Sequence, residues 1–92
     1  MIVQVKQKHI NKGQQCSPCD CPIALAIKEA LDVSDDERVS VDGDEVLIFA
    51  ASDELVRAYR PTKKMVRFIE RFDDKGKKAV KPGIFKLERA DR

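Results

Sequence analysis

The chain lacks tryptophan and has one tyrosine and four phenylalanines among its 92 residues. So few aromatic side chains argue against the exposed stacking platforms with which many proteins bind single-stranded nucleic acids. No apolar run approaches the roughly 20 residues that a transmembrane helix needs, so no membrane association is expected. Residues 1–6 also lack the basic-then-apolar layout of a signal peptide. These absences predict a soluble protein of the cytoplasm, where cysteines stay reduced.

The sequence also has little of what enzymes commonly use. His9 is the only histidine, and the four glycines stand too far apart to form a phosphate-binding loop. The acidic residues between positions 32 and 45 lack the regular alternation of oxygen ligands, closed by a glutamate, of a calcium-binding loop. We therefore expect a binding protein and not an enzyme, with no cofactor, and interpret the acidic residues as a solvated edge.

The length of the chain predicts a single domain, residues 1–92. Period-2 and period-3.6 hydrophobic patterns predict seven elements. In chain order these are a strand at 3–5, a helix at 22–31, strands at 38–41, 45–49 and 55–59, a helix at 62–75 and a strand at 84–87. The order β-α-β-β-β-α-β indicates an α+β fold, with a small mixed or antiparallel sheet and two helices packed on one face.

Local signals define several of these boundaries. Residues 9–20 are polar and contain glycine and proline, which predicts a loop. Pro22 suits the first position of the helix that follows. Gly43 between two apolar runs predicts a tight hairpin turn with positive φ. Residues 55–59 fit either a third strand of this meander or a capped helical turn, and we favour the strand.

The predicted helix at 62–75 has two different faces. Thr62 is a suitable N-cap, and Gly76 a suitable left-handed C-cap. An apolar stripe at helical spacing faces the core and consists of Met65, Phe68, Ile69 and Phe72. A second face is basic and consists of Lys64, Arg67, Arg71 and Lys75.

Charge is divided unevenly along the chain. Residues 1–50 hold 5 Lys/Arg against 9 Asp/Glu, whereas residues 51–92 hold 13 against 7, so a balance of −4 precedes one of +6. The excess peaks in ten side chains, which are the candidate partner-binding residues: Arg57, Arg60, Lys63, Lys64, Arg67, Arg71, Lys75, Lys77, Lys78 and Lys81. This basic half indicates an anionic partner.

The basic residues admit three interpretations. They can be a solvated helix face that keeps the protein soluble. They can bind phosphodiester backbones, because neutralised phosphates release counterions whatever the base sequence. They can also dock on an acidic protein groove and gain association rate from electrostatic steering. No helix-turn-helix, homeodomain or RNA-recognition pattern accompanies them.

A cluster near the N-terminus contains the candidate metal ligands His9, Cys16, Cys19 and Cys21. Three thiols and an imidazole can hold zinc tetrahedrally, but a structural zinc site usually draws a second ligand pair from downstream, where no cysteine or histidine follows. A thioredoxin-like redox site is a further alternative. We favour a third interpretation, in which no metal binds, Cys21 is a small buried residue at the helix entry and the other two cysteines are loop thiols.

Two segments resemble a family of small phage and prophage accessory proteins. One is His9-Ile-x-x-Gly13 with Cys21-Pro-Ile-Ala-Leu-Ala-Ile27, and the other is Phe68-Ile-x-x-Phe72-Asp73 followed by Gly76, Val80, Pro82, Phe85 and Leu87. The resemblance implies a protein of the host cytoplasm that acts on host machinery by binding. A prominent class of this kind is the anti-CRISPR proteins, and this chain looks like an inhibitor of a type I surveillance complex.

The first hypothesis is therefore an inhibitor that binds this crRNA-guided complex, through its Cas protein subunits and guide RNA, and blocks target DNA. Replacing Lys64, Arg67 and Arg71 by glutamate should abolish binding without unfolding the protein. Two alternatives stay open: a free-standing nucleic-acid-binding accessory protein, which would shift bare DNA or RNA in a salt-sensitive manner, and a small zinc module.

Overall fold

A computed structural model describes residues 1–33 and 37–90, and residues 34–36 of the acidic segment lie outside that description. The elements in chain order are β1 (Ile2–Val5), α1 (Gln7–Lys12), α2 (Pro22–Ala30), β2 (Arg38–Val41), β3 (Val46–Phe49), β4 (Leu55–Pro61), α3 (Lys63–Lys75), the 3-10 turn η1 (Lys77–Ala79) and β5 (Gly83–Arg89). The predicted α+β class is confirmed. Within the described part, no helix has the length and hydrophobicity of a membrane span.

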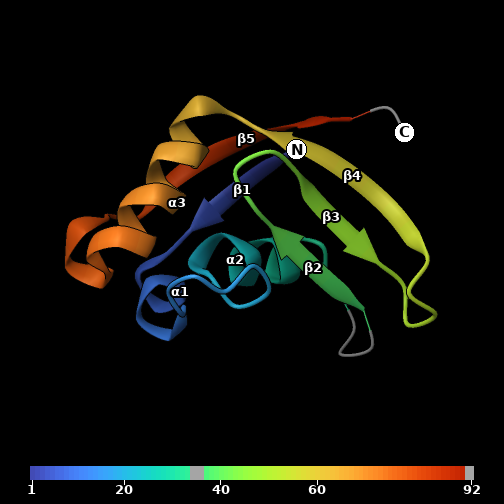
Figure 1. Ribbon diagram of the computed structural model, residues 1–92, viewed down its shortest axis with the longest axis horizontal. Coiled ribbons are helices and arrows are strands. Elements are labelled where there is room, and N and C mark those ends of the chain that lie inside the picture. Colours follow the sequence, from blue (N-terminus) through green and yellow to red (C-terminus); the bar gives the residue numbers. More distant parts are fainter. Residues whose placement is uncertain (34–36, 91–92) are drawn as a thin grey trace.

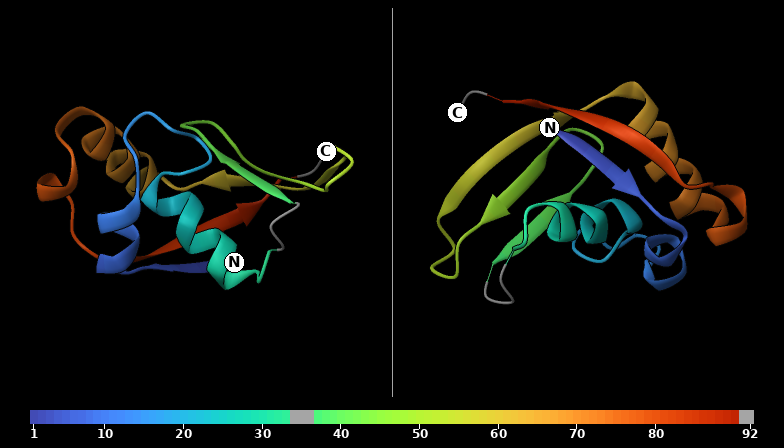
Figure 2. Two further views of the ribbon diagram at one scale, coloured as in Figure 1. Left: turned by 90° about the horizontal axis from the view of Figure 1, so that it is seen from below. Right: turned by 180° about the vertical axis from the view of Figure 1, so that it is seen from behind.

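The five strands form one antiparallel sheet in the order β1-β5-β4-β3-β2. The sheet curls, and its inner side encloses α2 while α3 lies at one end (Figure 1; Figure 2). β5, the last strand in the chain, lies between β1 and β4. α2 contacts both β1 and β2, which are the two edge strands, so this helix bridges the opening of the curl.

The core lies on the inner side of the sheet, as the alternating strand patterns predicted. Val3 and Val5 point inward, and Val3 is paired with Phe85, whereas Ile84 on the outer face is 58% exposed. α2 begins at Pro22, as expected, and buries most of its surface. The apolar stripe of α3 is buried, and its Phe68 ring meets Phe85 edge to face, with ring centroids 5.2 Å apart. Each such buried side chain contributes about 1.5–3 kcal/mol.

The predicted loop at 9–20 is wrong over its first residues, because Gln7–Lys12 form α1. A helix of six residues is too short for its pattern to stand out or for its propensity to hold it. Packing stabilises it instead, since His9 and Ile10 are buried and α1 contacts α2. The backbone N–H of Lys6 also donates to His9 Nδ1 at 2.9 Å, which fixes the first turn.

The hairpin between β2 and β3 is present, but its turn differs from the prediction. Among the glycines, a positive φ is found at Gly76 and not at Gly43. The Asp42 carboxylate instead accepts hydrogen bonds from the N–H groups of Asp44 and Glu45, each at 2.7 Å. An aspartate that bonds its own following backbone can close a turn without a left-handed glycine.

Candidate partner-binding surface

The surface around α3 is shaped by the way in which this helix ends. Gly76, with φ 86°, donates its N–H to the carbonyl of Phe72 at 2.8 Å and ends α3. Thr62 is the N-cap residue at the other end, with no side-chain capping bond. The chain then reverses through η1, and residues 79–83 line one wall of a pocket whose other wall is α3.

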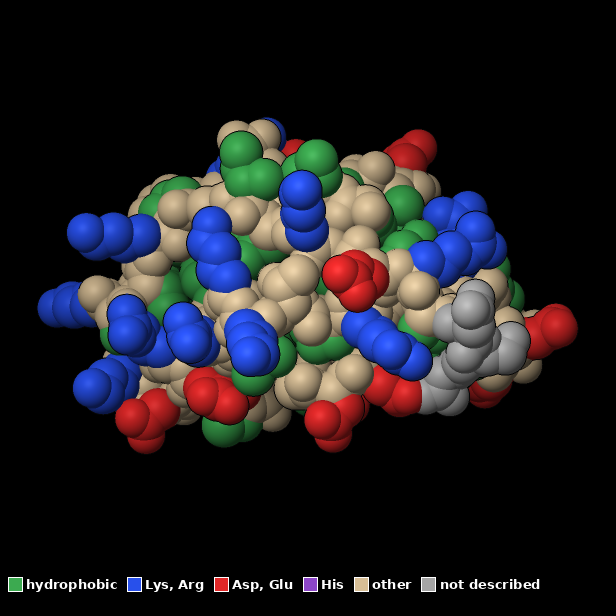
Figure 3. Space-filling model, turned by 90° about the horizontal axis from the view of Figure 1, so that it is seen from above, with side chains coloured by type: hydrophobic (Ala, Val, Ile, Leu, Met, Phe, Trp, Pro, Cys, Tyr) green, Lys and Arg blue, Asp and Glu red, His purple; other side chains and the backbone are tan. Residues whose placement is uncertain are grey.

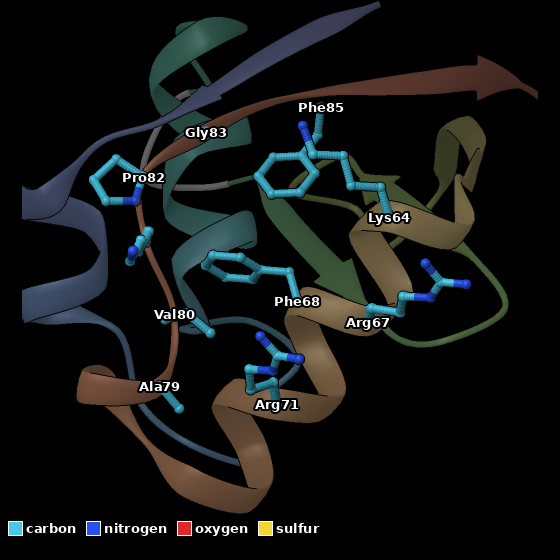
Figure 4. A pocket seen from close by; sticks show the side chains of 10 residues that line it. Lys64, Arg67, Phe68, Arg71, Ala79, Val80, Pro82, Gly83 and Phe85 are labelled. Carbon is cyan, nitrogen blue, oxygen red and sulfur yellow. The ribbon is translucent and has the colours of Figure 1, made fainter.

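This pocket has a volume of about 470 Å³ (Figure 4). Its apolar lining comes mainly from Phe68, Val80, Pro82 and Phe85. Its cationic lining comes from Lys64, Arg67, Arg71 and Lys81, and no carboxylate is among the residues that line it. We call this site the basic pocket; the small residues Ala79 and Gly83 complete it.

The four cations of the basic pocket are held differently. Lys64 Nζ donates to the carbonyl of Ile84 at 3.1 Å and lies 5.1 Å from the centroid of the Phe85 ring, a cation–π contact. In Figure 4, Arg71 points toward Phe68, whereas the end of Arg67 points outward. In residues 1–33 and 37–90, none of the four cations forms a salt bridge. Their charge is therefore available to an anionic partner.

The other six predicted partner-binding residues surround this pocket or lie apart from it. Lys75 shares a shallow hollow with Arg67, Arg71 and two carboxylates, Glu70 and Asp74. The side chain of Lys77 is bonded to the carbonyl of Asn11, so it braces α1. Exposed positions in α3, η1 and β4 hold the remaining four, Lys63, Lys78, Arg60 and Arg57.

Figure 3 shows Lys and Arg side chains gathering at the end of the molecule that carries α3. In the register of the sheet, Arg57 lies opposite Ile48 and Arg60 lies opposite Glu88. Neither arginine lines the pocket. The sequence thus identified the cations but missed the apolar pocket among them. The feature of the sequence that could have indicated the pocket is Ala79-Val80, an apolar pair inside the basic run from 77 to 81.

The loop that carries the cysteines connects several elements. The side-chain amide of Gln15 donates to the carbonyls of Phe72 and Asp73, each at 3.1 Å, and so covers the C-terminal end of α3. The Cys16 N–H donates to Asp73 Oδ1 at 2.9 Å, and Lys28 Nζ donates to the Cys19 carbonyl at 2.8 Å. The loop therefore fixes α3 relative to α2.

The three thiols have separate environments. Cys21 is buried as the N-cap of α2, where its Sγ accepts the Ala24 N–H at 3.4 Å, and burial raises the pKa of this thiol. Cys16 is exposed and Cys19 is half-buried. Cys21 is therefore a buried residue at the helix entry, as expected, and Cys16 and Cys19 are loop thiols.

His9, the fourth candidate ligand, has both ring nitrogens occupied. Nδ1 accepts the Lys6 N–H, and Nε2 lies 2.7 Å from Glu29 Oε2. Across the part of the chain that the structure describes, no group of three or more His, Cys, Asp or Glu side chains is placed to hold a metal ion. The side chains of the candidate zinc site are therefore not arranged to fit zinc.

The contacts of Glu29 predict a pH dependence of stability. The hydrogen bond with His9, followed by that with Lys8, lowers the pKa of Glu29 from 4.5 to about 2. A lowered pKa means stabilisation that is complete above the unfolded-state pKa and is lost as the pH falls from about 4.5 through about 2. We expect Glu29→Gln to lower the melting temperature at neutral pH. The difference from the wild type should shrink across this window, as followed by circular dichroism; a constant difference would contradict the assignment.

The chain was also compared with known proteins. No protein-family model, curated protein or solved structure matches it.

Proposed function

We propose that this protein is a non-enzymatic binding protein that docks on an anionic partner through the basic pocket and the cations around it. The observation that carries the proposal is the pocket itself: four cations, free of salt bridges in the described structure, around an apolar floor. Charged side chains that form no internal salt bridge can steer association and select partners of opposite charge. The packing of α3 on β5 through Phe68 and Phe85 holds the backbone of the helix that carries Lys64, Arg67 and Arg71.

The partner that we propose is a host defence ribonucleoprotein, the type I crRNA-guided surveillance complex, which the protein inhibits by blocking access of target DNA. This choice rests on the resemblance of two segments to small phage accessory proteins and on the charge layout. A ribonucleoprotein offers RNA phosphates and acidic protein surface side by side, and both are complementary to the basic pocket. A rigid protein of this size, bound beside the guide RNA, would obstruct the path of DNA without any chemical step.

The proposal is tested by mixing the purified protein with a purified type I surveillance complex and measuring the capture of labelled target DNA. We expect a stable protein–complex interaction and loss of DNA capture, and restored plating of a restricted phage in cells that express the protein. Absence of both binding and restored plating would refute the proposal.

A parallel measurement distinguishes the free-standing nucleic-acid-binding alternative. Bare DNA and RNA are titrated with the protein at low and at physiological salt. Under the proposal, binding to the complex persists at physiological salt, whereas any shift of bare nucleic acid is lost, because binding that depends only on phosphate neutralisation weakens steeply with salt. Tight, salt-sensitive binding of bare nucleic acid without binding to the complex would instead favour the alternative.

A further inference from the structure

The basic pocket combines cationic side chains with an apolar floor. A nucleic-acid backbone would not need both. Phosphates are satisfied by cations alone, and an apolar floor adds nothing to such contacts. Bases are bound by exposed aromatic faces on which they stack. Phe68 and Phe85 offer no such face, because they are 8% and 3% exposed and pack edge to face against each other. The ammonium group of Lys64 also lies over the Phe85 ring.

An apolar floor inside a ring of charge is instead typical of a protein-binding hot spot, where an anchor side chain fills a pocket and polar residues surround it. The volume of about 470 Å³ lies within the usual range of ligand pockets and accommodates a large side chain. Ala79, whose side chain is a methyl group, and Gly83, which has no side chain, leave room for it. A Cβ added at Gly83 would meet Phe85 at 3.6 Å, so even this small addition would lie against the aromatic floor.

We infer that the basic pocket receives an apolar anchor side chain from an acidic segment of a protein, with the carboxylates that flank the anchor on Arg67, Arg71 and Lys81. Arg67 points outward from the floor, which suits a flanking contact and not an anchor contact (Figure 4). Charge complementarity selects the acidic flanks, since the lining holds four cations and no carboxylate. The inference rests on the proposed function and assigns the contact to a protein subunit of the partner and not to its RNA.

The test uses three fluorescent probes: an Asp/Glu peptide with one central phenylalanine, the same peptide with serine in its place, and a single-stranded RNA of equal charge. We expect the phenylalanine peptide to bind at least about tenfold more tightly than the serine peptide, because burying the anchor removes its apolar surface from water. Ala79→Trp should fill the pocket and abolish this preference. Ala79→Leu fills less of the pocket and is used if the tryptophan variant does not fold.

The matched control is Ala51→Trp, which adds the same side chain at an exposed position outside the pocket and should retain the preference. Equal affinity for the two peptides would overturn the inference. RNA binding that is tighter than peptide binding and is unchanged by either Ala79 substitution would also overturn it. If the wild type and both Ala79 variants capture the surveillance complex equally well, the inference is overturned and the proposed function stands. Failure of the wild type to bind the complex, with peptide selectivity retained, would refute the proposed function alone.

Discussion

Reversing the charge of Arg67 and Arg71 is expected to weaken binding to the surveillance complex at least about a hundredfold. The two side chains lie on successive turns of α3, line the basic pocket and form no salt bridge in the described residues. Glutamate at both positions removes the attraction and places like charges against an anionic partner, which costs several kcal/mol. About 2.7 kcal/mol is already a hundredfold change in Kd. The measurement is the Kd for the purified complex by surface plasmon resonance.

Lys64 is left unchanged in this double variant, because its bond to the Ile84 carbonyl and its contact with Phe85 also hold the wall of the pocket. The control is Lys86→Glu with Arg89→Glu, an equal change of net charge at exposed positions of β5 outside the pocket. This control should change Kd by no more than about threefold, since neither side chain lines the pocket and salt screens the field of exposed charges. A similar loss of affinity in both double variants would show that net charge, and not the basic pocket, directs binding.

Replacing Gly13 by alanine is expected to lower the free energy of unfolding by about 3 kcal/mol, the upper part of the usual range for overpacking. A Cβ at this position would lie 2.6 Å from Cδ and Cγ of Pro22 and 2.8 Å from its nitrogen. Pro22 is the buried first residue of α2, and the Gly13 N–H is bonded to His9 at 2.8 Å, so neither segment can move away cheaply. For a domain of this size the melting temperature should fall by about 12–24 °C.

Gly43→Ala is the matched control for this substitution. Gly43 has no heavy atom within 4 Å of an added Cβ and does not require a positive φ. Alanine there should leave stability unchanged or raise it slightly, because it restricts the unfolded chain. Thermal unfolding followed by circular dichroism compares the two variants. Equal melting temperatures for them would contradict the role of the Gly13–Pro22 contact.

The fold was predictable from the sequence where periodicity extends over several residues. The α3 stripe and the alternating strands are such cases, and the structure confirms each. α1 was missed because packing of Ile10, not a repeated pattern, holds it. The turn at Gly43 was misjudged because the Asp42 carboxylate, and not the glycine, closes it.

The candidate surface, like the fold, was predictable from the sequence only in part. A list of lysines and arginines is visible in the sequence, and helical spacing places Arg67 and Arg71 on one face of α3. The pocket between them and residues 79–83 depends on the reversal of the chain after Gly76 and on the seating of β5. Such long-range geometry leaves no local pattern. For the same reason Phe68 and Phe85 read as core residues only, although they also form the floor of the pocket.

The position of β5 between β1 and β4 has a kinetic consequence. Until residues 83–89 are available, β1 has no neighbour in the sheet, and β2, β3 and β4 form a separate meander. The hydrogen bond from the Met1 amino group to the Leu87 carbonyl joins residues 86 positions apart in the sequence and so closes a long loop. Closing such a long loop lowers the entropy of the chain before the contacts form, and this entropic cost slows folding. A chain that lacks β5 therefore leaves the facing edges of β1 and β4 unpaired, and one continuous sheet forms only when β5 pairs with both.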